Sequence, residues 1–490
     1  MLALSGSSPL DTPSPNFPFI EIALPQGEPS RDTIAQLCEL SARPEPLLAR
    51  RGSDVLFRDV VERLNDSFAP ESCAAYDRVF AQVIEFYRRL PAARELDERL
   101  RQFGLPDEAS LLERKARLGH PRLPKVDSIR KALLLSRVTI GADVAVTSVL
   151  IAGVRQRYPQ AEIVLLGSAK LRELFGGDAR IRVRELRYER GGTVLARLRS
   201  WLAVAAAVEE EARDCAPVEL LVLDPDSRLT QLGLLPVLED ETRYLFFESR
   251  RFGHETDLPL GQLTARWWQT LSGVETALFP QLALPAEHLA FGQTVARKLR
   301  QTGQPHLVSL SFGVGGNAQK RVNDDFEAAL LSQLRQDSAL ILDKGGAPDE
   351  RAQVDALTAA LRAAGQQVLE LNAENAAVKL AAETGQPAIV TWDGSIGAFA
   401  GLIAASDQYI GYDSAGQHIA AALGVPALTV FVNSNSQRFA ERWRPFGTGI
   451  SKVFQLPSES LAKLTGHTDS TAALFAEVLK LHQELLEGCA

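Results

Sequence analysis

Cysteine is scarce in this 490-residue chain, and its placement excludes two common frameworks. The four cysteines, Cys38, Cys73, Cys215 and Cys489, are scattered, and no two of them form a CxxC pair. Without that spacing or a nearby histidine pair, neither a zinc site nor a disulfide scaffold is expected. We therefore expect reduced, mostly buried thiols in a cytoplasmic protein, and no metal.

Long apolar runs are missing as well. No stretch approaches the roughly 18 residues that a membrane-spanning helix needs. Residues 1–30 contain six prolines but neither a basic start nor a continuous apolar segment, which predicts a disordered leader and not a signal peptide. Any membrane contact is expected to be peripheral.

An excess of positive charge is also absent. Lysine and arginine number 53 against 61 acidic residues, which gives a net charge of -8. Nucleic acid is therefore not expected as a main partner, because neutralising phosphates requires a basic surface. The composition is 46% hydrophobic and 23% charged, as in globular proteins, and the length predicts two or three domains.

Residues 31–125 have a helical pattern. In YDRVFAQVIEFYRRL (76–90), apolar and aromatic residues recur at helical spacing. We interpret this stripe as core packing and not as a cofactor site.

From residue 126 onward, short apolar runs alternate with helical segments. The expected strands of a first block lie at 131–136, 161–167, 218–224 and 242–247, and those of a second block lie at 306–313, 339–346, 367–371, 388–394, 408–413 and 427–432. Continuous apolar strands separated by helices are typical of parallel sheets covered on both faces. The pattern predicts an α/β protein with two facing doubly wound, Rossmann-like domains, 126–295 and 296–465, and a C-terminal helix (466–490) that crosses back.

Ligands of such sheets bind beyond the carboxyl ends of the strands, and the turn in YDSAGQHIAAALGVP (412–426) is one candidate. Ser414 and Gln417 fit a capping box, and the free N–H groups and positive dipole of the following helix suit a phosphate. Gly416 lets a ligand approach the backbone, and His418 lies one turn after Ser414. An ordinary capped helix with a packed histidine is the alternative interpretation.

Three further turns have polar residues after a strand. The glycine-rich loop SFGVGGNAQKR (311–321) lacks a P-loop fingerprint, but its N–H groups and Lys320 suit an anion. In LDKGGAPDERAQ (342–353), Glu350 is either a helix-dipole partner or a ribose contact. In SRVTIGADVAVTSVL (136–150), Asp143 is either an N-cap or a general base.

Taken together, these segments resemble glycosyltransferase family 9, the ADP-heptose:lipopolysaccharide heptosyltransferases. The resemblance spans roughly 130–460 and is strongest in SDQYIGYDSAGQHIAAALGVPALTVF (406–431), which has the family's Asp-[Ser/Thr]-Gly-x-x-His pattern with one residue's latitude. RWRPFG (442–447) and DGSIGAFAGLIAASD (393–407) fall in the family's order. The resemblance implies the GT-B fold, with the acceptor-side domain first and the nucleotide-sugar domain second.

The resemblance also implies an activity and a set of site residues. The activity is inverting, metal-independent and cofactor-free transfer of a sugar, with heptose the leading candidate, from a nucleotide-diphosphate sugar such as ADP-heptose to a hydroxyl of a lipopolysaccharide-type glycan. Asp143 is the implied general base. The implied diphosphate contacts are Lys320, Arg321, Ser414, Ala415, Gly416, Gln417 and His418. The implied nucleoside contacts are Gly345, Gly346 and Glu350, and Asp393, Gly394 and Asp413 complete the donor cleft. The implied acceptor side comprises Gly141, Thr147, Asp224, Asp226 and Arg228.

Two alternatives stay open. The sequence VN follows Lys320–Arg321 where the family usually has Trp-Pro, and this departure fits a GT-B-shaped binding or assembly protein without catalysis. The other alternative is a glycosyltransferase whose acceptor is a protein docked by residues 31–125. The expected partners are thus a nucleotide sugar and a glycan, glycolipid or protein acceptor, and the sequence predicts no oligomeric state.

Overall fold

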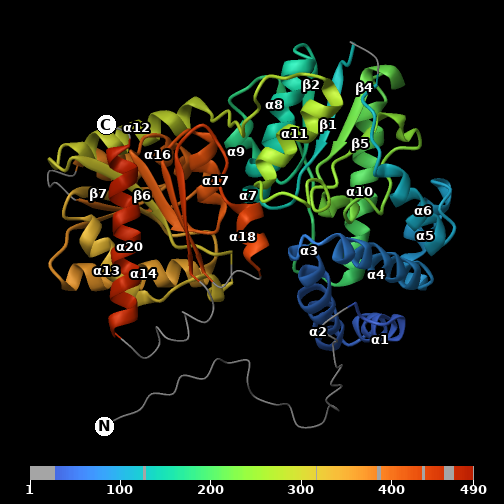
Figure 1. The fold of residues 1–490 in the computed structure, drawn as a ribbon, viewed down its shortest axis with the longest axis horizontal. Helices are drawn as coiled ribbons and strands as arrows, with labels where there is room; N and C mark the ends of the chain where they lie inside the picture. The colour runs from blue at the N-terminus through green and yellow to red at the C-terminus, as the bar shows by residue number, and fades with distance from the viewer. Residues whose placement is uncertain are drawn as a thin grey trace, which may run out of the picture.

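The computed structural model describes residues 28–124, 128–315, 317–382, 388–432, 436–456 and 468–488. It consists of a helical N-terminal region, a first sheet domain and a second sheet domain, which follow one another along the colour ramp of Figure 1. Residues 1–27 of the predicted leader lie outside the described residues.

The first sheet has five parallel strands in the order β3-β2-β1-β4-β5. The strands are β1 (Lys131–Leu135), β2 (Glu162–Gly167), β3 (Ile181–Glu185), β4 (Leu220–Asp224) and β5 (Tyr244–Phe246). The helices around it are α7 (Ile140–Ala142), α8 (Ser148–Arg157), α9 (Leu171–Phe175), α10 (Val194–Ala212) and α11 (Leu260–Ser272). Strands β1 and β4 consist of buried residues throughout, as expected for strands covered on both faces.

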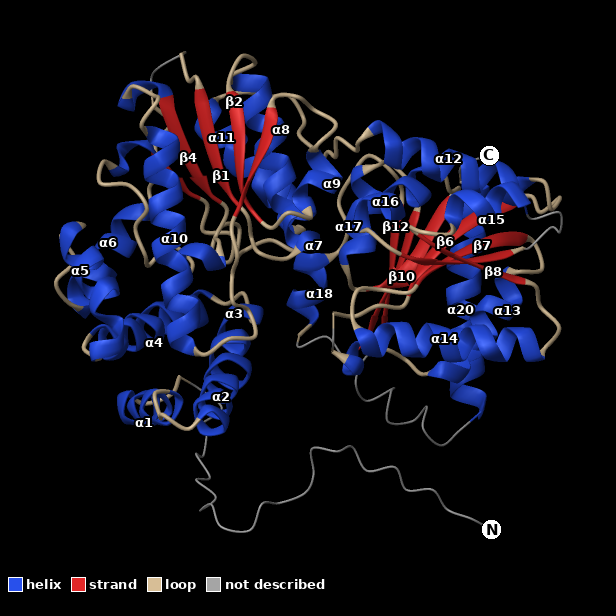
Figure 2. Cartoon of the chain, turned by 180° about the vertical axis from the view of Figure 1, so that it is seen from behind, coloured by secondary structure: helices blue, strands red, loops and turns tan. Residues whose placement is uncertain are grey.

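The second sheet has seven parallel strands in the order β12-β11-β10-β6-β7-β9-β8 (Figure 2). They are β6 (His306–Ser311), β7 (Ser338–Asp343), β8 (Val368–Asn372), β9 (Ile389–Asp393), β10 (Gln408–Tyr412), β11 (Ala427–Val432) and β12 (Ser451–Leu456). The helices are α12 (Ala286–Arg300), which leads into this domain, α13 (Asp324–Leu334), α14 (Pro348–Ala363), α15 (Ala376–Ala382), α16 (Ile396–Ala404), α17 (Ala415–Ala422), α18 (Gln437–Trp443) and α20 (Thr468–Glu487).

The helical N-terminal region shares its core with the first sheet domain. Its helices are α1 (Arg31–Ser41), α2 (Pro46–Val55), α3 (Arg63–Asp66), α4 (Pro70–Arg88), α5 (Arg94–Gln102) and α6 (Glu108–Leu118). The aromatic stripe of α4 is buried in one cluster with Leu133 and Leu135 of β1 and with Trp201 of α10. The indole of Trp201 donates to the carbonyl of Pro236 at 2.7 Å, which satisfies its only polar atom.

Two parallel α/β sheets and a helical N-terminal region confirm the expected fold class. Two strands were not expected, namely β3 and β12, and both lie at sheet edges. Each has only one buried residue, so neither forms the continuous apolar run that identifies an interior strand. Within the described residues, no helix is long and apolar enough to cross a bilayer.

The predicted position of the last helix is wrong. α20 does not cross back to the first domain but packs on α13, β11 and β12 of the second. Its apolar side chains Leu474, Val478 and Leu485 are buried in the cluster that covers one face of the second sheet. That face needs a covering layer, and the amphipathic helix supplies it locally.

The helices α12 and α16 cross at unusually short range, and glycine makes this possible. A β-carbon at Gly292 of α12 would overlap the carbonyl group of Gly401 on α16, and one at Gly401 would overlap the carbonyl oxygen of His288. The helix that joins the domains is therefore held against the second domain by backbone-to-backbone contact.

We predict that Gly292→Ala lowers the free energy of unfolding by about 1–3 kcal/mol, because the added methyl forces the two helices apart. Thermal unfolding measures the change. Gly191→Ala is the matched control, since a β-carbon there meets no atom within 4 Å. Equal melting temperatures for the two variants would contradict the prediction.

Candidate functional site

Each sheet has a central point at which the strand order reverses direction, and the second sheet also has β8 and β9 interchanged at one edge. In the first sheet the central point lies between β1 and β4, and in the second between β6 and β10. Open α/β sheets bind ligands beyond the carboxyl ends of the strands at this point. The loops after these four strands contain Asp143, Arg228, Lys320 and the turn 413–417, so the fold places most predicted residues where a ligand is expected.

A chain of polar contacts joins the loop after β6 to the turn after β10. The ammonium group of Lys320 donates to Oδ2 of Asp413 at 2.6 Å, and the amide of Gln417 donates to Oδ1 at 2.8 Å. The same amide nitrogen lies 3.4 Å from Nε2 of His418. Four residues predicted for the donor site are thus brought together around one carboxylate.

The predicted capping box at the start of α17 is wrong. Ser414 is the N-cap residue, but its side chain accepts no hydrogen bond from the helix. The Gln417 side chain donates to Asp413, and its carbonyl oxygen, which would accept from the Ser414 amide in a capping box, has no partner among the described residues. The first N–H groups of α17 are left without a side-chain cap, and an uncapped helix start attracts an anion.

Buried polar and aromatic atoms surround this helix start. Gln417 is fully buried, and its carbonyl oxygen has no partner among the described residues. A β-carbon at Gly416 would overlap the Tyr409 phenol, so glycine is needed for the helix to reach the sheet. An unpaired buried acceptor costs free energy, and such atoms often lie where a ligand or water binds.

His418 is neutral at physiological pH. Its side chain is buried, and burial lowers its pKa to about 4, although the charge of Asp413 acts in the opposite direction. Its ring centroid lies 6.0 Å from that of Trp443 on α18. The imidazole is therefore suited to donate or accept a hydrogen bond but not to supply positive charge.

The loop after β1 contacts the same helix start. A β-carbon at Gly141 would lie 3.3 Å from Cα of Ala415 and 3.3 Å from Cδ2 of His418. α7 and α17 lie together between the two sheets in Figure 1. The predicted acceptor and donor sides thus meet directly at Gly141.

Asp143 is enclosed by its own loop. Its Oδ1 accepts hydrogen bonds from the Arg137 amide at 2.7 Å and the Thr147 hydroxyl at 2.8 Å, and its Oδ2 accepts one from the Ser136 hydroxyl at 2.6 Å. Only 1% of the residue is exposed, and burial raises its pKa to about 6 despite the three donors. As placed, the carboxylate fixes the loop that holds Gly141.

Two of the predicted acceptor-side carboxylates also organise a loop. Asp224 is fully buried and accepts hydrogen bonds from Thr230 and Tyr244 at 2.5 Å each. Asp226, with a left-handed φ of 67°, accepts hydrogen bonds from the side chains of Ser249 and Arg250. Neither carboxylate is placed to meet a sugar acceptor, because its oxygen atoms are buried and already accept hydrogen bonds from nearby side chains.

Arg228 differs from these carboxylates. Its side chain is half-buried at the carboxyl end of β4, and its guanidinium makes no hydrogen bond or ion pair within the described ranges. A positive group at a switch point that is free of hydrogen bonds within the described ranges is suited to bind an anionic or hydroxyl-rich ligand, and an opposing charge, Asp66, lies within electrostatic reach of it.

Glu350 does not present its carboxylate to a ligand. One oxygen accepts hydrogen bonds from the amides of Val314 and Gly315 at 2.8 and 2.9 Å, and the other from Gly346 and Ala347 at 3.0 and 3.1 Å. Glu350 therefore joins the glycine loops after β6 and β7, and the ribose role predicted for it does not fit this placement. Gly345 has a φ of 76°, and a β-carbon there would crowd the same carboxylate.

Two further predicted residues pair outside the Lys320 group. Arg321 turns toward α13 and binds Glu327 at 2.8 Å and Asp324 at 2.6 Å. Asp393 accepts a hydrogen bond from Arg351 at 3.0 Å, and Gly394 packs on the Trp392 ring. The expectation that Arg321 faces a diphosphate does not fit its placement, because the buried carboxylate of Glu327 holds it.

Sequence reasoning missed three residues of this site. The buried Arg137 guanidinium lies 5.9 Å from the Trp443 ring centroid, and the Lys320 ammonium lies 5.2 Å from that of Phe439. Arg137 stands two residues after β1, in a turn that the switch-point rule selects. The two aromatic residues belong to α18, and only the RWRPFG segment indicated that helix in advance.

Three arginines attach α18 to the first domain. Arg442 donates to the carbonyls of Leu258 and Gly253 at 2.6 and 2.7 Å. Arg438 and Arg444 donate to three other main-chain carbonyls in the loop 253–258. Arg442 is 1% exposed. α18 therefore bridges the two domains beside the candidate site.

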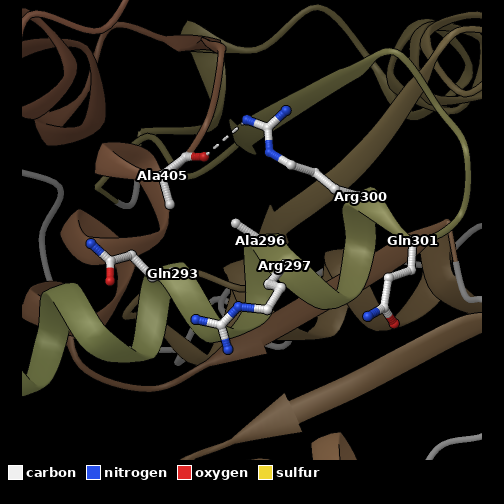
Figure 3. Close-up of a pocket in the computed structure, with 6 residues that line it drawn as sticks. All are labelled: Gln293, Ala296, Arg297, Arg300, Gln301 and Ala405. Atoms are coloured by element: carbon white, nitrogen blue, oxygen red, sulfur yellow. Dashed lines mark hydrogen bonds between the residues drawn. The ribbon is translucent and has the colours of Figure 1, made fainter.

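A hollow of about 520 Å³ lies elsewhere on the second domain (Figure 3). It is lined by Gln293, Ala296, Arg297, Arg300, Gln301 and Ala405. Arg300 pairs there with Asp407, just before β10, so the hollow lies at the amino ends of the strands. Within the described part of the chain, no group of three His, Cys, Asp or Glu residues is arranged to hold a metal ion.

Comparison with known proteins adds a family to this geometry. Residues 345–464 match the family model described as glycosyltransferase family 9 (heptosyltransferase). This segment includes the turn 413–417, α17 and α18. A search of curated protein sequences gives no significant match.

Solved structures show a similar fold. The glycosyl transferase family 9 protein from Veillonella parvula DSM 2008 is 13% identical and aligns over 74% of this chain and 98% of its own, with a TM-score of 0.51. The ADP-heptose LPS heptosyltransferase II of E. coli is 19% identical, with coverages of 74% and 100% and a TM-score of 0.45. The E. coli heptosyltransferase WaaC with ADP is 13% identical, with coverages of 72% and 99% and a TM-score of 0.46.

At such identities a structural likeness establishes the fold alone, whereas the family model matches sequence at the candidate site itself. The sheets of five and seven strands are arranged as in the GT-B fold. Residues 345–464 of this chain therefore match the glycosyltransferase family 9 (heptosyltransferase) model, and the two sheets have a GT-B architecture.

Proposed function

We propose that this chain is an inverting glycosyltransferase that moves a sugar from a nucleotide-diphosphate donor to a hydroxyl acceptor. The observation that carries the proposal is the pairing of Lys320 with the uncapped start of α17 at the switch point of a family 9 domain. The family resemblance of the sequence makes ADP-heptose the first donor to test and a lipopolysaccharide-type glycan the first acceptor.

In the proposed reaction, the main contribution is stabilisation of the leaving diphosphate. The acceptor oxygen forms a bond to the anomeric carbon, the bond from that carbon to the diphosphate oxygen breaks, and its electron pair leaves with the diphosphate. Lys320 turns from Asp413 to the phosphates, and the α17 N–H groups and neutral His418 add hydrogen bonds. Lys320 and the N-terminal end of the α17 dipole supply the positive charge, so we propose that the reaction requires no metal.

Asp143 is the first candidate for the base that takes the acceptor proton. In this role it gives up one of its three hydrogen bonds when the acceptor arrives. A carboxylate with a pKa near 6 is a stronger base than an ordinary one and is still largely ionised at pH 7.

A second candidate function is binding or assembly without catalysis. It is favoured by the enclosure of Asp143 and by the contact of Gly141 with Ala415 and His418, which covers part of the α17 start. The two functions differ in turnover: both predict binding of a nucleoside diphosphate, but only the first predicts sugar transfer or donor hydrolysis.

Calorimetric titration with ADP, UDP and ADP-heptose tests the donor site directly. We expect saturable binding of at least one nucleoside diphosphate, followed by release of that nucleotide when the sugar donor and an acceptor are supplied. The absence of saturable binding to any of them would sink the proposed function. Binding without turnover would favour the assembly role.

We predict that Lys320→Met weakens nucleoside-diphosphate binding by roughly tenfold to a hundredfold, the range expected for one lost hydrogen bond between charged groups. Lys452→Met is the matched control, because that lysine pairs with Glu484 on the far side of the second domain. Calorimetry on both variants measures the effect, and equal affinities would remove Lys320 from the site.

His418 predicts a pH dependence of stability. Because burial lowers its pKa to about 4, the native state binds fewer protons than the unfolded state between about pH 4 and 6.5. Stability is therefore lost as the pH falls through this window, by up to about 1.4 kcal/mol per pH unit. His418→Gln lacks this loss, so the gap between the two melting curves should close toward acid pH. Parallel curves from pH 4.5 to 7.5 would refute a buried neutral imidazole.

We predict that Asp143→Asn lowers transfer by roughly a hundredfold or more and leaves donor affinity within about twofold. The variant also melts at a lower temperature, since one amide oxygen cannot accept three hydrogen bonds. Ser136→Ala is the control, because it removes one donor and keeps the carboxylate. It should lose stability without a comparable loss of transfer, whereas full transfer by Asp143→Asn would exclude this residue as the base.

A further inference from the structure

One turn of the helical N-terminal region contacts α18, the helix that bridges the two sheet domains. It joins α3 to α4, and Phe68 at its tip has a left-handed φ of 53°, which is uncommon for an aromatic residue. The Ser67 hydroxyl holds the turn by donating to the Leu64 carbonyl at 3.1 Å and accepting from the Ala69 amide at 3.2 Å. A bulky side chain held in this conformation indicates a position that its surroundings require.

Phe68 packs with the sheet domains and not with its own region. It is 2% exposed and belongs to the apolar cluster that spans both sheet domains, whereas the other core residues of the helical region form a second cluster. Its ring centroid lies 6.5 Å from that of Phe439 on α18. α3 and α18 lie beside each other in Figures 1 and 2.

The same contact leads to the lysine of the proposed donor site. The ammonium group of Lys320 lies 5.2 Å from the centroid of Phe439, a distance at which a cation is attracted to a ring face. Phe439 also packs against Trp443, with centroids 6.4 Å apart. Phe68 therefore supports the ring on which Lys320 rests.

Asp66 brings a negative charge to the same place. It is half-buried at the end of α3, and burial raises its pKa while the charges of Arg228, Arg250 and Lys320 lower it. Its carboxylate thus lies within electrostatic reach of cations from both sheet domains.

We propose that the turn 66–69 forms a wall of the diphosphate site, with Phe68 as a positioning residue that holds Phe439 beneath Lys320. This inference rests on the proposed function and extends it, because it makes the helical N-terminal region part of the donor site. Phe68 acts through Phe439 and touches neither the donor nor the reacting atoms.

Two substitutions in this turn have effects of opposite sign. Phe68→Ala removes the support of Phe439 and weakens binding of ADP and of inorganic pyrophosphate by about tenfold, as expected for a lost aromatic contact and the loosening that follows. Asp66→Asn removes a negative charge near the incoming phosphates and tightens both by about threefold at low salt, an effect that shrinks as ionic strength rises.

The experiment is calorimetry on the full chain with ADP and with pyrophosphate, accompanied by thermal unfolding of every variant. Phe80→Ala is the matched control, because Phe80 is equally buried but belongs to the cluster that the helical region shares with the first sheet, away from α18. Phe68→Leu, which keeps an apolar side chain, should recover most of the affinity. We expect Phe80→Ala to lower the melting temperature with ADP affinity within about twofold of wild type.

The outcomes separate this inference from the proposed function. Wild-type affinity in Phe68→Ala, equal losses in Phe68→Ala and Phe80→Ala, or weaker binding by Asp66→Asn would each overturn the role of the turn and leave the donor site standing. If the wild-type chain binds neither ADP nor pyrophosphate, the proposed function fails and the inference fails with it. If Phe68→Ala does not fold, Phe68→Leu and Asp66→Asn still decide.

Discussion

A parallel sheet presents all its carboxyl ends along one edge, and the remainder of this architecture depends on that constraint. Each sheet here has a central reversal of strand order, and the loops at these two reversals meet where α7 packs on α17. Polar residues far apart in the sequence, such as Arg137, Arg228 and Lys320, come together for this reason alone. The helical N-terminal region adds a third element because its core is continuous with the first sheet.

Several carboxylates of the chain lie where an anionic ligand would be attracted. Asp413 holds Lys320, and Glu350 accepts four backbone N–H groups at the glycine loops. Asp343, beside Glu350 and Asp393, has its pKa raised to about 7 by burial. Binding of a phosphate to such a site is an exchange of one anion for another, so the affinity depends on the difference between two similar interactions.

The sequence predicts the interior of this fold much better than its loops. Interior strands such as β1 and β4 contain continuous apolar runs that identify them, whereas the alternating edge strand β3 gives no such signal. The position of the candidate site followed from the strand-to-helix turns. The hydrogen-bond partners within the turns could not be predicted, because the spacing of the residues does not determine whether Gln417 contacts Ser414 or Asp413.

Residues from other parts of the chain were the least predictable. Nothing near Phe68 in the sequence marks it as a neighbour of Phe439, since 370 positions separate two side chains that only the tertiary fold brings together. The role of Arg442 could not be predicted either. It binds main-chain carbonyl groups, which every residue has, so no residue type in the sequence indicates its partners.

The attachment of α18 to the loop 253–258 has a consequence for how the chain can vary. Its three arginines bind five carbonyl oxygens of the main chain and no side chain of the loop. Every amino acid supplies the same carbonyl, so substitutions in the loop leave the attachment intact as long as the path of the backbone is kept. An insertion or deletion of one residue, in contrast, moves the acceptors out of reach. At this junction, the length of the loop is therefore more restricted than its residues, apart from Gly253, whose φ of 67° favours glycine.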